Sequence, residues 1–368
     1  MAAIMAAIME ITENIMRRMH EPSTKLHNAL YFMSGMMVVI LALVIVAGVK
    51  TKAENAGFHI ADDTENSYEQ QVAGQTEKWQ EGVVAYQGKE YLYNTDIKTY
   101  LMMGVDIDGP VQRSSDYTQG GQSDALFLLV VNNKTEQLQV ISINRNTMAD
   151  IELCDEEGID MGPLKTQICL QHAFGDGKRL SCSKTVDAVS GLFQNIPISG
   201  YLAMNMGGIP QMNDAVGGVE VTVQQDISFP KAGVNLKKGQ KVTLNGTQAY
   251  YYLHGRDTEE YDSATKRLQR EEQYIVAYMD KLKKVSTENP DQVTEIYNSV
   301  SDYLVTSVDF TSMIEQLMNY GFSEDQMYTV PGKTVEGKPI DGKRYEEYHV
   351  DEDAMEELIM KVFYTPVQ

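Results

Sequence analysis

The chain has 368 residues and a formal net charge of −21 at pH 7, so it is long enough to bury a core in one large or two small domains. This acidic balance excludes a general nucleic-acid binder, because phosphate contacts need a positively charged surface. The three cysteines lack C-x-x-C spacing, which excludes the common zinc sites. Two interpretations of them stay open. Either Cys169 and Cys182 form a disulfide in a domain outside the cell, or all three, with Cys154, are buried thiols.

The N-terminal part divides into three segments. Residues 1–28 carry mixed charge and no chemical motif, whereas 29–49 form an apolar run without a charged side chain. At about 1.5 Å per residue, a helix over this run spans about 30 Å, the thickness of a bilayer's hydrocarbon core, so we predict one transmembrane helix. The run is longer than the apolar region of a signal peptide. Residues 50–88 are polar and low in aliphatic side chains, which is typical of a stalk.

From residue 89 onward, stretches typical of strands alternate with stretches typical of helices. Residues 125–131 (ALFLLVV) are continuously apolar, as in a strand buried on both faces. A turn at 132–134 and an alternating stretch at 138–143 follow, so we predict a hairpin. Apolar side chains recur at helical spacing in 264–285. Together these patterns predict an α/β fold, a layered α-β-α domain with a mixed central sheet. We assign residues 89–285 to this domain. Residues 286–368 form a predicted C-terminal α/β extension packed on the same globule.

Charged side chains stand beside these predicted strands. Asp106 follows a short apolar run, Asp124 directly precedes residues 125–131, and Arg145 follows residues 138–143. Ligands of α/β proteins lie at strand ends, and Mg²⁺ takes one or two protein carboxylates together with phosphate oxygens of a substrate. The pattern therefore favours a site for a divalent cation and a phosphate. The alternative, which spacing alone leaves open, is that Asp106 and Asp124 are turn or cap residues.

Two further arginines, Arg267 and Arg270, lie three residues apart near the start of the helix predicted at 264–285. Residues at this spacing share one side of a helix. Positive side chains oppose the macrodipole at a helix N-terminus, so this placement favours a bound anion. A solvated pair of surface arginines is the alternative.

Several motifs occur in the order that is characteristic of the LytR-CpsA-Psr family. They are GVD at 104–106, SD at 123–124 and SINRNT at 142–147, followed by IPISGYLAMNMGGIPQMNDAVGGVEVTV, LNGTQAYYYLHGRD and RLQREEQ. On these motifs, which lie between about residues 91 and 282, the chain resembles that family. The resemblance implies a membrane-anchored phosphotransferase that moves a glycopolymer from a polyprenyl-pyrophosphate carrier onto peptidoglycan. It also implies a cytoplasmic N-terminus and an extracellular domain.

The resemblance assigns roles to individual residues. Asp106 and Asp124 would bind Mg²⁺, or Mn²⁺ in its place. Arg145, Arg256 and Arg267 would bind the pyrophosphate, because guanidinium groups donate in a fork that matches phosphate. Asp124 is also a candidate acceptor for the proton of the attacking hydroxyl, so Asp124 and Arg145 are the expected catalytic residues. An apolar groove for the prenyl chain is implied as well.

The sequence departs from the family pattern around these residues. Three of the changes remove positive charge, and Glu271 adds a negative charge where the family has glutamine. Arg113 and Arg270 are candidates to compensate as additional phosphate-binding residues. We therefore expect a divergent branch of the family, with a non-catalytic module that binds or senses envelope lipid or glycan as the alternative function. The other changed positions are Gln122, Asn144, Asn146, Gln167 and His254.

Overall fold

We describe the fold from a computed structural model, which covers residues 82–367 apart from 256–260, 290, 310–318 and 338–345. Its centre is a six-stranded sheet with the strand order β13-β8-β3-β4-β5-β14. β3 is parallel to β8 and β5 is parallel to β14, whereas the other neighbours are antiparallel, so the sheet is mixed as predicted. The strands are β3 (Ile97–Val105), β4 (Ser123–Asn132), β5 (Gln137–Ile143), β8 (Gly200–Asn205), β13 (Leu304–Thr306) and β14 (Met327–Thr329).

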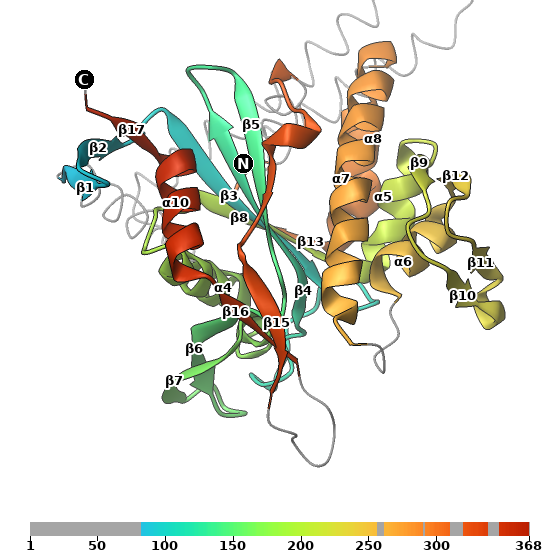
Figure 1. Cartoon of the computed structure of the whole chain (residues 1–368). Coiled ribbons are helices and arrows are strands. Elements are labelled where there is room, and N and C mark those ends of the chain that lie inside the picture. Colours follow the sequence, from blue (N-terminus) through green and yellow to red (C-terminus); the bar gives the residue numbers. More distant parts are fainter. Residues whose placement is uncertain (1–81, 256–260, 290, 310–318, 338–345, 368) are drawn as a thin grey trace, which may run out of the picture. The chain divides into compact units, whose positions relative to one another are not determined.

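Helices cover both faces of this sheet: α4 (Arg179–Leu192) and α10 (Glu352–Phe363) lie on one face, and α7 (Ser263–Glu288) lies on the other (Figure 1). Alternate side chains of β4, beginning with Leu126, pack in a core with α4 and α10. The side chains between them, beginning with Phe127, pack against α7. The continuous apolar run of β4 thus serves two cores, which confirms the layered arrangement.

The predicted hairpin is formed by β4 and β5, whose register pairs Leu126 with Ile143 and Asn132 with Gln137. The side chain of Asn132 accepts hydrogen bonds from two main-chain N–H groups of the turn, those of residues 134 and 135. Glu136 has a positive φ of 53°. The turn that the asparagines predicted is therefore present.

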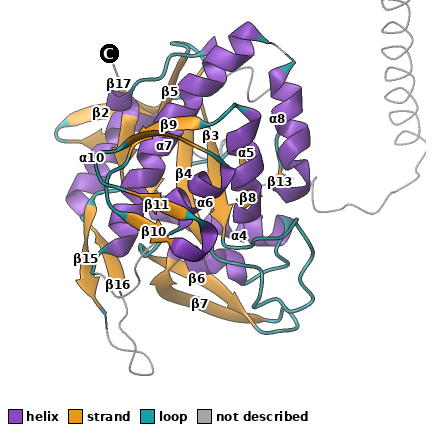
Figure 2. Cartoon of the chain, turned by 90° about the vertical axis from the view of Figure 1, so that its right-hand side faces the viewer, coloured by secondary structure: helices purple, strands orange, loops and turns teal. Residues whose placement is uncertain are grey.

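A second cluster of helices and hairpins packs beside α7 around its own core, which includes Tyr252, Tyr274 and Leu282. Figure 2 is turned so that this side faces the viewer. α6 begins with a capping box, in which the side chains of Asn245 and Gln248 each accept from the other's main-chain N–H. The elements are α5 (Ile209–Ala215), α6 (Gly246–His254), α8 (Gln292–Val300), β9 (Val219–Thr222) with β12 (Lys241–Leu244), and β10 (Ile227–Phe229) with β11 (Val234–Leu236).

The N-terminal segments 1–28 and 29–49 lie outside the described residues, together with most of the stalk predicted at 50–88. Within the range that the structure describes, no helix combines the length and apolar character needed to cross a bilayer. The predicted transmembrane helix at 29–49 therefore stays a prediction.

The end of the predicted stalk is corrected by the structure, because Val84–Tyr86 form strand β1. β1 pairs with β2 (Lys89–Tyr93) across a turn in which Gln87 and Gly88 have positive φ. β2 also pairs with β17 (Tyr364–Pro366), which places the two ends of the described chain in one sheet. The alternation in VAYQGKEYLY, interrupted by a glycine turn, was the available signal.

In the part of the chain that the structure describes, the remaining elements are two hairpins and five short 3₁₀ helices. β6 (Met148–Cys154) pairs with β7 (Asp160–Gln167), a hairpin that the sequence analysis did not predict. The apolar side chains of this segment do not mark a buried face, since Ile159, Met161 and Leu164 are exposed. The others are β15 (Gly332–Glu336) with β16 (Glu346–Val350), η1 (Ile168–Ala173), η2 (Met206–Gly208), η3 (Pro230–Ala232), η4 (Ser301–Tyr303) and η5 (Glu324–Gln326).

Candidate active site

Three strand ends meet at one edge of the central sheet. β3 and β5 both run antiparallel to β4, so the end of β3 and the end of β5 lie beside the start of β4. Asp106 directly follows β3, Arg145 follows β5, and Asp124 is the second residue of β4. The register shifts at Gly104 and Val105, and such an irregularity changes the direction of the side chains that follow it. Residues far apart in the chain are therefore brought together here.

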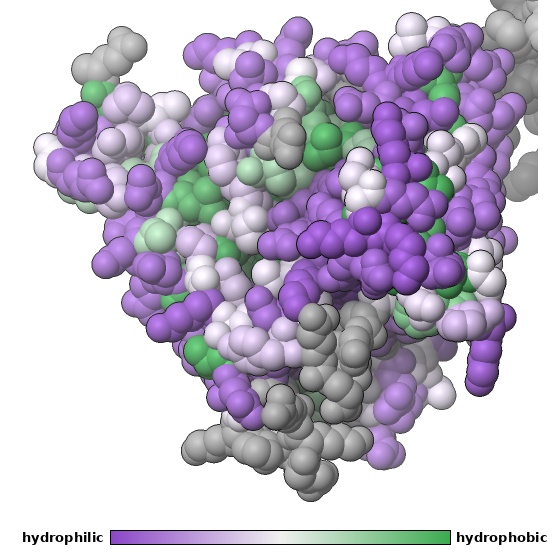
Figure 3. Space-filling view, turned by 45° about the vertical axis from the view of Figure 1, so that its right-hand side comes forward, coloured by the Kyte–Doolittle hydropathy of each residue, from purple (hydrophilic) through white to green (hydrophobic). Residues whose placement is uncertain are grey.

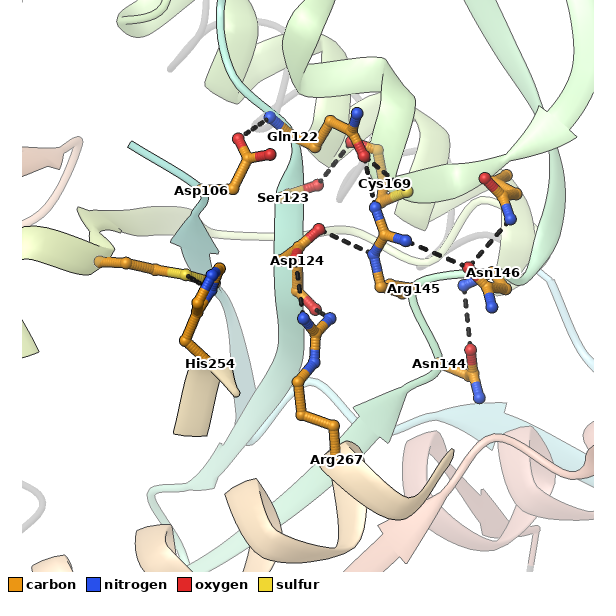
Figure 4. Close-up of polar contacts among 12 residues, drawn as sticks. Asp106, Gln122, Ser123, Asp124, Asn144, Arg145, Asn146, Cys169, His254 and Arg267 are labelled. Carbon is orange, nitrogen blue, oxygen red and sulfur yellow. Dashed lines mark hydrogen bonds and ion pairs between the residues drawn. The ribbon is translucent and has the colours of Figure 1, made fainter. Parts of the chain in front are cut away.

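Asp124 lies between two guanidinium groups (Figure 4). Its Oδ1 is 2.7 Å from Nε of Arg145, and its Oδ2 accepts a 2.8 Å hydrogen bond from Nη1 of Arg267. Nη2 of Arg267 donates to the main-chain oxygen of Asp124 at 2.9 Å. The side chains of Asp124, Arg145 and Arg267 are only 8%, 10% and 2% exposed. Because buried charges need partners, the carboxylate and the two arginines stabilise one another as a unit.

Amide side chains surround the guanidinium of Arg145. Its Nη2 donates to the side-chain oxygen of Gln122, and its Nη1 donates to Oδ1 of Asn146 at 3.4 Å. The same Oδ1 accepts from Nε2 of Gln167 at 2.9 Å, while Asn144 accepts from the main-chain N–H of Asn146. Four of the departures from the family pattern thus form an uncharged hydrogen-bond network that orients Arg145.

The carboxylate of Asp106 lies at the same edge, with an exposed side chain. Its Oδ1 accepts from the main-chain N–H of Gln122 at 2.6 Å. Partial removal of solvent raises the pKa of Asp106, and the charge of Asp124 acts in the same direction, whereas the N–H of Gln122 and the charge of Arg145 oppose it. A carboxylate in this setting gains from a nearby cation.

The oxygen atoms of Asp106 and Asp124 suit a hard divalent cation such as Mg²⁺. A carboxylate oxygen has two lone pairs, so hydrogen bonds from the arginines do not prevent Asp124 from binding a cation. No group of three or more His, Cys, Asp or Glu side chains among the described residues is arranged to hold a metal ion. A cation at the two aspartates would therefore take its other ligands from water and phosphate oxygens, as Mg²⁺ commonly does.

His254, the last residue of α6, faces the same cluster (Figure 4). Its Nδ1 is 2.9 Å from Sδ of Met206. Burial lowers the pKa of His254, and the positive charge of Arg267 lowers it further, although three neighbouring aspartates oppose this. The imidazole is therefore neutral at pH 7 and does not replace the positive charge of the arginine that the family has there.

An apolar cavity of about 230 Å³ lies beside this cluster. Its walls come mainly from β3, β4 and β8 and from helices α5, α7 and α8. Its lining includes Gly104 on β3 and Ala125 on β4, and Ala125 directly follows Asp124. The sequence analysis could not assign this lining, because it comes from separate elements. Flexible side chains are frequent in the wall, namely Met102, Met103, Met204, Met206, Met212 and Met279.

Glu271 of α7 also lines the cavity and connects it with the cluster. Its Oε1 is 3.3 Å from Nε of Arg267, four residues earlier on the same helix. Burial raises the pKa of Glu271 to about 7, while the charge of Arg267 opposes the increase. This carboxyl group therefore changes charge near neutral pH.

Arg113 and Arg270, the expected additional phosphate-binding residues, have other partners in the structure, and a role for them in binding phosphate stays a prediction. Arg270 is fully buried and donates to the main-chain oxygens of Tyr252 and Gly255, so it stabilises the C-terminal end of α6. Arg113 is exposed, with its Nε 3.9 Å from Asp176. Arg267 and Arg270 share a side of α7, but one reaches β4 and the other reaches α6. Arg256, the remaining predicted phosphate-binding arginine, lies outside the described residues.

The three cysteines are buried free thiols, so the disulfide considered for Cys169 and Cys182 is not formed. Sγ of Cys182 lies 3.7 Å from Nε2 of His172, and Sγ of Cys169 lies 3.8 Å from Oε1 of Gln122. Burial raises the pKa of Cys169 to about 11, so this thiol is neutral although Arg145 lies close to it. The alternative of reduced thiols is the one that the structure supports.

These features define an α/β domain with a carboxylate and arginine cluster at one edge of a mixed sheet and an apolar cavity beside it. The family model LytR_cpsA_psr matches residues 49–362, and the chain belongs to the LytR-CpsA-Psr family, as its motifs predicted.

Relatives from several bacteria share this sequence pattern. The "Polyisoprenyl-teichoic acid--peptidoglycan teichoic acid transferase TagU" of Enterococcus faecalis is 29% identical over 231 residues, which cover 62% of this chain and 67% of that protein. The protein of the same name from Oceanobacillus iheyensis is 30% identical over 64% of this chain and 66% of its own length. "Biofilm regulatory protein A" of Streptococcus mutans is 27% identical over 63% of this chain and 55% of its own length. The match thus spans about half to two thirds of these relatives.

Solved structures share the fold. Bacillus subtilis TagV aligns with a TM-score of 0.56 at 22% identity, over 73% of this chain and 96% of TagV. Protein gbs0355 from Streptococcus agalactiae also has a TM-score of 0.56, at 20% identity, over 73% and 87% of the two chains. The structure of TagT bound to LI-WTA has a TM-score of 0.51 at 19% identity, over 73% of this chain and 90% of TagT. These similarities concern the fold, and they confirm the α/β class.

Proposed function

We propose that this protein is an envelope enzyme that transfers a glycopolymer phosphate from a polyprenyl-pyrophosphate carrier to a hydroxyl group of peptidoglycan. One observation carries the proposal: the apolar cavity lies beside the charged cluster, because Ala125 in its wall directly follows Asp124, and Glu271 in its wall pairs with Arg267. The cavity suits a prenyl chain, and the arginines suit the diphosphate at its end. Family members named for teichoic acid transfer from a polyisoprenyl carrier to peptidoglycan support the same reaction class.

In this reaction the acceptor oxygen attacks the phosphorus that carries the polymer. The bond from that phosphorus to the bridging oxygen breaks, the bridging oxygen keeps the electron pair, and polyprenyl phosphate leaves. Arg145 and Arg267 would stabilise the negative charge on the phosphates, and Asp124 would hold both guanidinium groups in position. Mg²⁺ bound by Asp106 and Asp124 would neutralise phosphate charge when present. The hydroxyl proton passes to a base, for which Asp124 stays the candidate.

The sequence supports a location for this activity. A transmembrane helix at 29–49 would hold the catalytic domain beside the membrane in which the polyprenyl carrier is dissolved. A cytoplasmic N-terminus would place that domain outside the cell, where its acceptor lies.

The proposal is tested by Arg145→Lys, which keeps the charge but removes forked donation to phosphate. The full chain in detergent is given a fluorescent polyprenyl-pyrophosphate-linked oligosaccharide and Mg²⁺, and release of polyprenyl phosphate is measured. We expect the rate to fall about 10- to 100-fold, because each charge-assisted hydrogen bond contributes about 1.5–3 kcal/mol. The control is Lys134→Ala, at the opposite end of the hairpin, which should leave the rate unchanged. Equal rates for wild type and Arg145→Lys would contradict the proposal.

A lipid-binding or sensing module is the second candidate. The observation that favours it is the pairing of both arginines with Asp124, because Arg267 is only 2% exposed. In the same assay this candidate predicts that the protein binds the carrier lipid but releases no polyprenyl phosphate when Mg²⁺ is added.

A further inference from the structure

Glu271 is an unusual residue for the wall of an apolar cavity. Among the described residues that line this cavity, the others are apolar side chains, glycine or tyrosine. Glu271 is only 5% exposed, and a buried carboxylate is costly unless a charged partner compensates it. Its position on α7 therefore needs an explanation beyond packing.

The partner of Glu271 is Arg267, at 3.3 Å. The guanidinium of Arg267 uses Nη1 and Nη2 to hold Asp124, and its Nε faces Glu271. In the proposed function, a ligand whose chain lies in the cavity places its anionic headgroup beside this same guanidinium. Glu271 and the headgroup are then two anions that share one cation.

We propose that Glu271 is a specificity-determining residue, which competes with the anionic headgroup of the ligand for Arg267. The ligand then binds to the form of the protein in which Glu271 is protonated. This proposal rests on the proposed function, and it adds the residue that makes binding depend on pH and on headgroup charge.

The charges around Glu271 support this competition. Burial favours its neutral form most strongly, and the negative charges of Asp124 on β4 and Glu272 on α7 act in the same direction. Arg267 and Arg270 favour the ionised form. With a pKa of about 7, both forms are present at neutral pH, and phosphate oxygens beside the carboxyl group would favour the neutral form further.

The size of the effect follows from the fraction of competent protein. If only the protonated form binds, the apparent Kd equals the intrinsic Kd divided by the protonated fraction. With a pKa of about 7, this fraction falls about tenfold between pH 6 and pH 8, so binding should weaken about tenfold. Binding at pH 8 should also take up about one proton.

The test measures binding of geranylgeranyl diphosphate to the full chain in detergent by calorimetry, at pH 6 and pH 8, in two buffers that differ in ionisation enthalpy. Glu271→Gln keeps an acceptor for Nε of Arg267 and removes the charge, so it should bind about tenfold more tightly than wild type at pH 8 and about equally at pH 6. Geranylgeraniol, which has the same chain and no phosphate, should bind both proteins without this pH dependence.

Glu272→Gln is the matched control, because it makes the same charge change one residue further along α7. The carboxylate of Glu272 accepts hydrogen bonds from Ser142 and from Thr329, at 2.8 Å for the latter, rather than from Arg267. This variant should still bind more weakly at pH 8 than at pH 6, with a midpoint slightly below that of wild type, because Glu272 helps to raise the pKa of Glu271. The titration of the ligand's own phosphates appears equally in all three proteins and cancels in the comparison.

Three results would overturn the proposal, and they differ in meaning. If wild type and Glu271→Gln bind the diphosphate with the same affinity at pH 8, Glu271 does not compete, while the proposed function stands. If no protein binds either prenyl compound, the cavity does not take a prenyl chain, and the proposed function fails as well. Proton uptake by wild type provides a second readout should Glu271→Gln unfold, and its absence at pH 8 would also exclude the competition.

Discussion

At the scale of single residues, Asp124 connects the parts of the candidate site. One oxygen of its carboxylate lies 2.7 Å from Nε of Arg145 in an ion pair, and the other accepts a hydrogen bond from Arg267. Arg145 follows the end of β5 and Arg267 lies on α7. The side chain of Asp124 therefore connects the edge of the sheet with helix α7. The site geometry therefore depends on a buried ion triad rather than on a single pair.

Asp124→Asn should destabilise the protein, because it leaves two buried guanidinium groups without their shared carboxylate. We expect a loss of about 3–5 kcal/mol in the free energy of unfolding, which denaturant titration would detect. The matched control is Asp96→Asn, which breaks the exposed pair with Lys134 at 3.4 Å and should change stability by less than about 0.5 kcal/mol. Equal stabilities of the two variants would show that the arginines do not depend on Asp124.

At the scale of elements, the cavity exists because α7 packs over the β3–β4 face across small and flexible side chains. Ala125 and Gly104 leave space near the site, and methionines such as Met279 fill the rest loosely. The same helix carries Arg267 and Glu271 at its N-terminal half and Leu282 toward its end. One helix thereby places the charged and the apolar part of the site.

Ile275→Trp, on the cavity-facing side of α7, should fill this space. We expect binding of geranylgeranyl diphosphate to weaken at least tenfold, with stability reduced by no more than about 1–3 kcal/mol for the larger side chain. Ile159→Trp, at a position that is 65% exposed in the β6–β7 hairpin, should leave binding unchanged. Undiminished binding by Ile275→Trp would place the prenyl chain elsewhere.

At the scale of the whole molecule, segments from both ends of the described chain share one core. Phe363 near the C-terminus is fully buried and packs edge-to-face on Phe193 of the helix layer, with ring centroids 6.1 Å apart. β17 pairs with β2 at the other end of the described chain. The face seen in Figure 3 is mostly hydrophilic with small hydrophobic patches, in keeping with a net charge of −21.

Phe363→Ala should therefore destabilise the entire α/β domain rather than its C-terminal part alone. We expect a loss of about 3–5 kcal/mol and a single unfolding transition at a lower Tm, measured by calorimetry. Val367→Ala, at a position that is 41% exposed, should have little effect. A separate low-temperature transition in Phe363→Ala would instead indicate that the C-terminal extension unfolds by itself.

The sequence alone determined the class of fold and the strand ends that carry Asp106, Asp124 and Arg145. Continuous and alternating apolar patterns are local, and strand ends follow from them, so these features were predictable. The family motifs predicted the chemistry expected at those ends.

Tertiary structure alone decided which charged groups meet. Arg267 and Arg270 are equivalent by spacing, yet one pairs with Asp124 and the other holds the end of α6, because each contacts whichever element packs nearest to it. The family resemblance implied an apolar groove and singled out Glu271, but the residues that line the cavity and the place of Glu271 in its wall could not be read from the sequence. Their positions depend on contacts between side chains more than a hundred residues apart, and no local pattern encodes such contacts.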